Sequence, residues 1–313
     1  MDYAGYGGLL MKTSKMRNKA RIMQRLRQIG LAVAVIAIVV WTLAPITWLA
    51  ISSITPYIEL ISDRMTHWFP ENPTLANFEV MFDLSKQTGQ RFVYALRNSL
   101  IISSCVTIIC LVAGTLAAYA LARLPVRRKK ELVLSLMSIR MLPTITLVIP
   151  FFVIISHIDY ALMNIGSEFH LFDTKFNLII LYTTFILGFV IWIMMGFFLS
   201  IPSELEEAAR IDGCTRLQAL FRVILPLSAP GLVATGILAF LLAWDEFLLA
   251  LIFTRSNNAI TLPLFIAELG SQYITAYDQI SAAGVMAAIP PVVLALLFQR
   301  FIVQGLTAGS VKG

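Results

Sequence analysis

The chain is a succession of long apolar stretches separated by short polar segments. A helix needs roughly 20 mostly apolar residues to cross the hydrocarbon layer, because only then are its backbone polar groups satisfied within the segment. Five stretches of this kind contain no charged residue, and a sixth contains only Arg140. The six lie at 29–51, 98–122, 132–156, 176–201, 223–244 and 279–299. The pattern predicts an all-α, polytopic membrane protein with six transmembrane helices.

The composition supports this prediction, since 58% of the residues are hydrophobic and only 13% are charged. Ordinary globular domains carry about a quarter charged residues, so a soluble domain is excluded. We divide the chain into a basic leader at 1–28, a transmembrane domain at 29–303 with its core at about 92–303, and a tail at 304–313. The net charge of +6 does not indicate nucleic-acid binding, because the cations gather beside the apolar stretches.

The cations also predict how the chain is oriented in the membrane. Lys and Arg cluster in the leader and again at 123–130, after the second apolar stretch. Cytoplasmic loops of membrane proteins are enriched in these residues. Both clusters are therefore expected in the cytoplasm, and with six spans the 200–222 loop and both termini follow them there. The leader has a second interpretation, as an interfacial basic helix on anionic lipid, and both can be true together.

Prolines lie inside several predicted spans, at Pro45, Pro143, Pro150, Pro230 and 290–291. Proline lacks a backbone N–H, so it kinks or breaks a helix. Such breaks are tolerated in membranes where neighbouring helices or a water-filled cavity satisfy the freed carbonyls. Simple bent packing and helices shaped around a pathway are both compatible with this pattern.

The loop at 200–226 has the pattern of a helix, a glycine turn and a second short helix. Ser203 with Glu206 predicts a capping box at the first helix, and Thr215 with Gln218 predicts one at the second. Gly213 would form the turn between them. The first helix has an apolar side with small residues at its centre, made of Leu205, Ala208, Ala209 and Ile211. Such a side would let another protein approach closely.

This loop resembles the cytoplasmic signature of the permease subunits of binding-protein-dependent ATP-binding-cassette (ABC) importers. The signature is Glu-Ala-Ala, three residues, Gly, nine residues, Ile, one residue and Leu-Pro. The residues here that match it are Glu207, Ala208, Ala209, Gly213, Leu225 and Pro226, with Val223 in the place of Ile. The alternative is an amphipathic surface loop that matches by chance. The resemblance implies the type I importer permease fold.

In that family the loop forms a coupling helix that sits in a groove of the ATPase subunit. The resemblance implies that Glu207 is the charged contact, Ala208 and Ala209 the close-packing surface, and Gly213 the turn. Leu225 and Pro226 complete the motif. The implied partners are a second homologous permease, two ATPase subunits that bind ATP and Mg²⁺, an extracytoplasmic solute-binding protein and the lipid bilayer. The implied location is the bacterial inner membrane.

Other stretches, at 140–143, 243–251, 261–263 and 305–313, resemble the shorter permease of maltose-type carbohydrate importers. The implied solute is an oligosaccharide, glycoside, polyol or sugar derivative. In that subunit the tail reaches between the ATPase subunits, which would give Gly309 and Lys312 a contact there. A frayed tail is the alternative.

Charges and aromatic residues near the membrane interior are candidates for the pathway. A charge inside the bilayer is costly, so it normally faces a cavity or a partner. Arg140, Trp244, Asp245 and Glu246 are therefore candidates for a lined cavity or an outer gate. A subunit-interface ion pair or a helix cap is the alternative for these residues. The three histidines, His67, His157 and His170, lack metal-ligand spacing.

No catalytic or metal-binding constellation is visible in the sequence. There is no Gly-x-x-x-x-Gly-Lys-[Ser/Thr] phosphate loop and no Gly-Lys dipeptide, so ATP hydrolysis is assigned to separate subunits. An ion-coupled secondary carrier is the rival hypothesis, with Arg140 and Asp245 as a proton-coupled site. It predicts inverted internal repeats, which are not evident. A membrane-embedded enzyme is a third possibility, without a candidate nucleophile.

Overall fold

The computed structural model describes residues 4–62, 68–270 and 276–308, and the side chains of 23–62, 68–139, 141–270 and 276–301. His67, Gly309 and Lys312 therefore lie outside the described residues, as does the side chain of Arg140. The described residues form helices and no strands, so the all-α prediction is confirmed.

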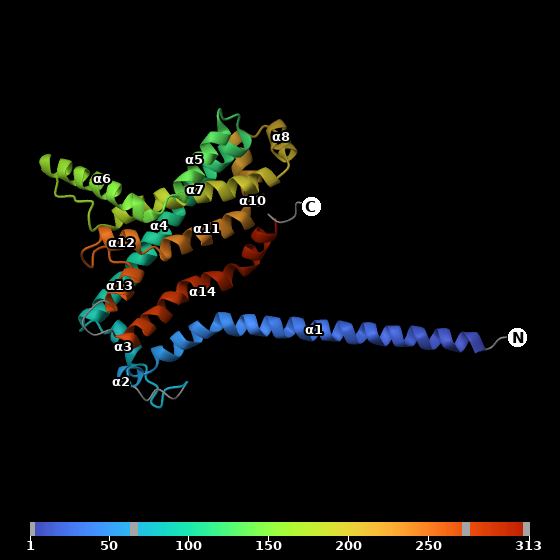
Figure 1. Cartoon of the computed structure of the whole chain (residues 1–313). Coiled ribbons are helices and arrows are strands. Elements are labelled where there is room, and N and C mark those ends of the chain that lie inside the picture. The colour runs from blue at the N-terminus through green and yellow to red at the C-terminus, as the bar shows by residue number, and fades with distance from the viewer. Residues whose placement is uncertain (1–3, 63–67, 271–275, 309–313) are drawn as a thin grey trace.

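Long helices build the bundle, and they pack in a chain of neighbours (Figure 1). The central pair is α4 with α7; α11 packs on both, α14 packs on α11, and α1 packs on α14. Their bounds are Ala4–Ser53 for α1, Gln87–Arg123 for α4, Lys175–Ser200 for α7, Ala229–Trp244 for α11 and Tyr277–Ala308 for α14. The predicted leader and first span form one continuous helix in α1.

Shorter helices connect these and complete the ends of the bundle. They are α2 (Tyr57–Leu60), α3 (Ala76–Phe82), α5 (Lys129–Met141), α6 (Thr144–Asn164), α12 (Leu248–Phe253) and α13 (Leu262–Leu269). Among the described residues, five helices are long and apolar enough to cross a membrane, or six if one bent pair counts as a single span. The predicted number of spans thus depends on that bent pair.

The third predicted span, 132–156, is wrong as a single helix. The helix is interrupted at Leu142 and Pro143, between the end of α5 and the start of α6. Leu142 has an extended backbone, with ψ 128°. Proline disfavours helical geometry in the residue before it and cannot donate a hydrogen bond one turn back. The helix that passes the length and hydropathy test is α6, at Thr144–Asn164. Arg140 falls in the last turn of α5 rather than inside that span.

The fifth predicted span, 223–244, is bent close to Pro230, one of the prolines expected to kink or break a span. The segment Arg216–Leu227 meets α11 at an angle of 80°, with Ser228 at the bend. Pro226 and Pro230 flank this residue, and neither can donate to the carbonyl four residues earlier. At the bend, the N–H and the hydroxyl of Ser228 both donate to the Ile224 carbonyl, at 3.0 Å and 2.8 Å. By contrast, Pro45, Pro150 and 290–291 lie inside helices that continue through them.

Small residues allow the central helices to approach closely. A Cβ added at Gly114 of α4 would lie 2.7 Å from the Cγ1 of Val190 on α7, and one at Gly231 of α11 would lie 2.5 Å from the ring of Phe197. Ala118 is fully buried. Helices in membranes associate largely through such packing, since lipid supplies little hydrophobic drive. Gly114 and Gly231 therefore stand where only a residue without a side chain allows the helices to come this close.

Toward its N-terminal end, α4 is held to the segment between α12 and α13 by hydrogen bonds from buried polar side chains. The Asn98 amide donates to the carbonyls of Asn257 at 3.1 Å and Ile260 at 3.0 Å. The Ser99 hydroxyl accepts from the backbone N–H of Leu262 at 2.8 Å. The segment is irregular, so these backbone groups have no helical hydrogen-bond partner. The side chains of Asn98 and Ser99 supply the partners and so hold the segment against α4.

Candidate coupling loop and outer pocket

Helix α8 (Ser203–Ile211) starts without the predicted side-chain cap. Pro202 is its N-cap and makes no side-chain cap bond, and Ser203 is the first helical residue. The capping box predicted for Ser203 and Glu206 is therefore wrong. Glu206 is 8% exposed and turns toward α4 instead. The reason is that a capping box needs Ser or Thr at the N-cap, and here Pro202 holds that position.

The turn after α8 has the conformation that glycine supplies. Gly213 has φ +92°, and the N–H of Cys214 donates to the carbonyl of Ala209 at 3.0 Å. A Cβ at Gly213 would meet no atom within 4 Å. The requirement at this position is therefore the positive φ and not space.

The second short helix begins as predicted. In α9 (Arg216–Ala219) the Gln218 N–H donates to the Thr215 hydroxyl at 3.3 Å. The Thr215 N–H donates to the Gln218 side chain at 2.8 Å. This reciprocal pair is a capping box, which satisfies two otherwise free backbone donors. The helix, glycine turn and helix expected from the sequence are thus present, and a π-helical turn (Leu220–Ile224) and α10 (Leu225–Leu227) lead into α11.

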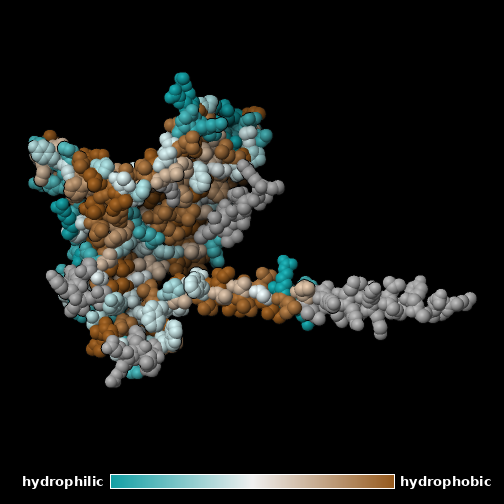
Figure 2. Space-filling view, in the orientation of Figure 1, coloured by the Kyte–Doolittle hydropathy of each residue, from teal (hydrophilic) through white to brown (hydrophobic). Residues whose placement is uncertain are grey.

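The loop exposes apolar side chains at a hydrophilic end of the molecule (Figure 2). Leu205 is 43% exposed, Ile211 86% and Leu217 60%. Ala208 and Glu207 are also exposed. We call Leu205, Glu207, Ala208, Ile211 and Leu217 the docking face. Ala209 and Leu225 are half-buried, and Pro226 is exposed at the bend before α11.

A polar cluster beneath α8 was not foreseen from the sequence. The Tyr119 hydroxyl donates to one oxygen of Glu206 at 2.6 Å, and the Nε of Arg123 lies 3.5 Å from the other. Tyr119 and Arg123 are four residues apart, so they share one face of α4. That spacing at the end of a span was the signal in the sequence, but it did not say which carboxylate would meet it.

The candidate pathway residues are not gathered into one site. Trp244 is 3% exposed, and its indole N–H donates to the Ala287 carbonyl of α14 at 3.2 Å. Asp245 is exposed and follows the last residue of α11. The Glu246 carboxylate accepts from the N–H groups of Leu249 at 3.0 Å and Ala250 at 3.4 Å, so it caps α12. The helix-cap interpretation describes the contacts of Glu246, and a pathway role for these residues stays a prediction.

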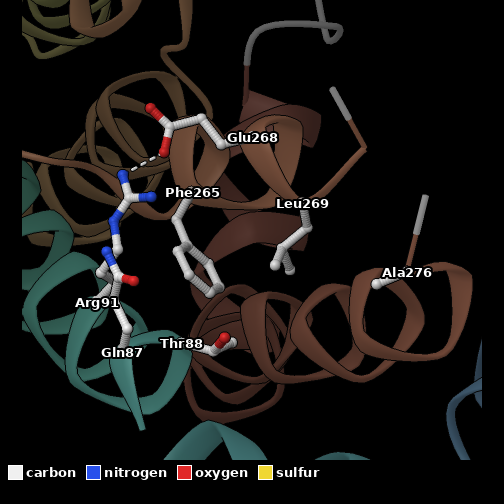
Figure 3. Close-up of a pocket in the computed structure, with 7 residues that line it drawn as sticks. All are labelled: Gln87, Thr88, Arg91, Phe265, Glu268, Leu269 and Ala276. Carbon is white, nitrogen blue, oxygen red and sulfur yellow. Dashed lines mark hydrogen bonds and ion pairs between the residues drawn. The ribbon is translucent and has the colours of Figure 1, made fainter. Parts of the chain in front are cut away.

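A small polar pocket lies beside the first turns of α4 (Figure 3), at the opposite end of that helix from α8 (Figure 1). Its volume is about 220 Å³. Arg91 forms an ion pair with Glu268 across it, and the Nε of Arg91 donates to the Asn257 side chain at 3.3 Å. The pocket is lined by Gln87, Thr88, Arg91, Phe265, Glu268, Leu269 and Ala276. It lies between α4, α13 and the start of α14, and the four pathway candidates do not line it.

The described residues contain no group of three or more His, Cys, Asp or Glu side chains placed to hold a metal ion. Apolar helices form a bundle, and a short helical loop presents an apolar face beyond it. These features define a multi-span membrane protein with an exposed helical loop at one end.

Residues 87–308 match the family of binding-protein-dependent transport system inner membrane components. The match covers most of the chain, and the chain belongs to this family. It is 38% identical to the sulfoquinovosyl glycerol transport system permease protein of Agrobacterium fabrum, over 87% of this chain and 89% of that protein. It is 39% identical to the trehalose transport system permease protein of Mycobacterium tuberculosis, over 88% and 94%.

The trehalose/maltose transport system permease protein of Thermococcus litoralis is 34% identical, over 92% of this chain and 98% of that protein. A crystal structure of a bacterial ABC transporter involved in the import of the polysaccharide alginate has a similar chain, with a TM-score of 0.68. That chain is 21% identical, over 88% of this chain and 96% of its own length. At this identity the likeness shows the fold alone. The resemblance drawn from the loop is confirmed.

Proposed function

We propose that this chain is one of two permease subunits that form the translocation path of an ATP-driven carbohydrate importer. The observation that carries the proposal is the docking face, a largely apolar surface on a helix–turn–helix loop at a hydrophilic end of the bundle. Monomeric soluble surfaces rarely expose apolar patches unless a partner covers them. The partner is the ATPase subunit, which binds ATP and Mg²⁺, while a solute-binding protein delivers the solute on the opposite side.

The proposed substrate is a carbohydrate, because relatives that share most of the chain transport sulfoquinovosyl glycerol or trehalose. The protein is a multi-pass inner-membrane protein, and we place the docking face and both termini in the cytoplasm. This orientation rests on the basic segments beside the spans. The carbohydrate class is tested by screening the cognate binding protein against a sugar library by thermal shift. A screen without any sugar-like ligand would refute the substrate class and leave the docking proposal intact.

The docking proposal is tested in the complete assembly with Ala208→Trp. The indole would hold the partner away from the exposed surface of α8, so we expect ATPase stimulation by the loaded binding protein to be lost. Ala161→Trp is the matched control, since Ala161 is an exposed alanine of α6, away from the docking face. Normal stimulation in the Ala208 variant would refute the proposal.

Reconstitution into vesicles distinguishes the ATP-driven importer from its rival, an ion-coupled secondary carrier. Uptake by an ATP-driven importer requires ATP and the binding protein and continues when an uncoupler dissipates the proton gradient. Uptake that proceeds without ATP and collapses with the uncoupler would instead establish an ion-coupled carrier.

A further inference from the structure

We propose that Tyr119, Arg123 and Glu206 form a clamp that makes α8 move as one body with α4. The inference rests on the proposed function, because it describes how a displacement of the docking face enters the bundle. It concerns residues outside the motif, since Glu206 precedes Glu207-Ala208-Ala209 and the other two lie on α4.

The clamp joins α8 to α4 through one buried carboxylate. Glu206 receives the Tyr119 hydroxyl at 2.6 Å on one oxygen and faces the Arg123 guanidinium at 3.5 Å on the other. Arg123 also donates to the carbonyl of Ile201, after the end of α7, at 2.6 Å. The Tyr119 hydroxyl lies 3.4 Å from the carbonyl of Arg216, at the start of α9. The single proton of Tyr119 is used for Glu206, so the bonds to the end of α4 come from α8 itself and from Ile201 just before it.

The Glu206 carboxylate is buried, whereas the other carboxylates of α8 are exposed. The side chains of Arg123 and Glu206 are each 11% exposed, and Tyr119 is 5% exposed. Glu204 and Glu207 are exposed. Burying a carboxylate is costly unless it is paired and hydrogen-bonded, and an apolar residue of similar size often packs as stably. A defined position for α8 is what the charged cluster adds, because its bonds require one geometry.

Helix α4 runs from α8 to the opposite end of the bundle, so it can carry this movement across the molecule. Helix α4 has 37 residues, which span roughly 55 Å at 1.5 Å per residue. Its last turns carry Tyr119 and Arg123, and its first turns carry the Arg91–Glu268 ion pair and the bonds from Asn98 to the segment before α13. A push on α8 is therefore transmitted along one rigid helix to the opposite end of the bundle.

The test measures the distance between α8 and α4 in the complete assembly. After replacement of the three native cysteines by serine, spin labels are placed at Arg210→Cys on α8 and Leu116→Cys on α4. Both positions are exposed. With the clamp intact we expect one narrow distance distribution that is the same without nucleotide and with ATP trapped. Tyr119→Phe combined with Glu206→Gln should broaden the distribution.

The same double variant should retain its ATPase subunits on purification, because the docking face is unchanged. Stimulated ATPase should fall roughly tenfold, since hydrogen bonds to charged groups shift two-state equilibria by about that factor. Glu204→Gln is the matched control on the same helix. Should the double variant fail to assemble, Tyr119→Phe alone serves, because the ring keeps its edge contact with Phe198 at 6.2 Å.

Two results would overturn the clamp: a distance that differs between the two states when the clamp is intact, or clamp variants with an unchanged distribution and full stimulation. The Ala208→Trp experiment separates this failure from failure of the docking proposal. If that variant uncouples the ATPase while the clamp variants do not, only the clamp is wrong. If that variant is fully stimulated, the docking proposal itself is wrong.

Discussion

The turn after α8 gives the sharpest prediction about coupling. Gly213 has φ +92°, and no atom lies within 4 Å of a Cβ built there, so substitution costs backbone energy without a steric clash. An L-residue in the left-handed region costs roughly 1–2 kcal/mol, which is a factor of about 5–30 in an equilibrium constant. Asparagine tolerates this region better than alanine, and β-branched residues tolerate it least. We therefore expect coupling to be strongest with the native Gly213 and to weaken in the order Gly213→Asn, Gly213→Ala and Gly213→Val.

The assay is ATPase stimulation by the loaded binding protein, measured on assemblies with equal amounts of permease in the membrane. Stimulation of the ATPase should fall in the alanine variant by up to about 5–30-fold, which corresponds to its backbone cost, and it should fall further in the valine variant. Insertion of the chain should be unaffected, because the spans are untouched. Full stimulation in the valine variant, or an asparagine variant as impaired as the valine one, would refute the argument from φ.

Three further predictions concern packing, capping and orientation. Gly114→Val should destabilise the α4–α7 contact by about 1–3 kcal/mol through overpacking against Val190, lowering the thermal unfolding midpoint in detergent; Gly196→Val is the control, since a Cβ at Gly196 meets no atom within 4 Å. Glu246→Ala should cost about 1 kcal/mol by removing the cap of α12, and an unchanged midpoint would contradict that role. A membrane-impermeant maleimide should label Cys214 in inside-out vesicles only, and labelling in right-side-out vesicles would place the docking face outside the cell.

The helical architecture and the family could be predicted from the sequence because both depend on local information. An apolar run of membrane length can satisfy its backbone only as a helix, whatever its neighbours are. The helix, turn and helix after Ser200 follow from Gly213 and the Thr215–Gln218 pair, which act within a few residues of themselves. The family motif lies in the same short loop.

Which of the prolines interrupt or bend the spans could not be predicted in this way. The sequence places prolines at 45, 143, 150 and 230, but α1 and α6 continue through the first and third of these. The chain is interrupted at Pro143 and bends by 80° beside Pro230. A proline removes one hydrogen bond in every case, and the packing of the surrounding helices decides whether the chain bends there.

Glu206 shows the same division between local and long-range information. Its spacing from Ser203 predicted a capping box, while its actual partner is Tyr119, 87 residues earlier in the chain. The sequence by itself determined the apolar spans, the loop with its motif and the positive-φ turn, because neighbouring residues encode them. Only the tertiary structure decided which helices bend and which carboxylate is buried, because those outcomes depend on side chains that meet after the bundle has assembled.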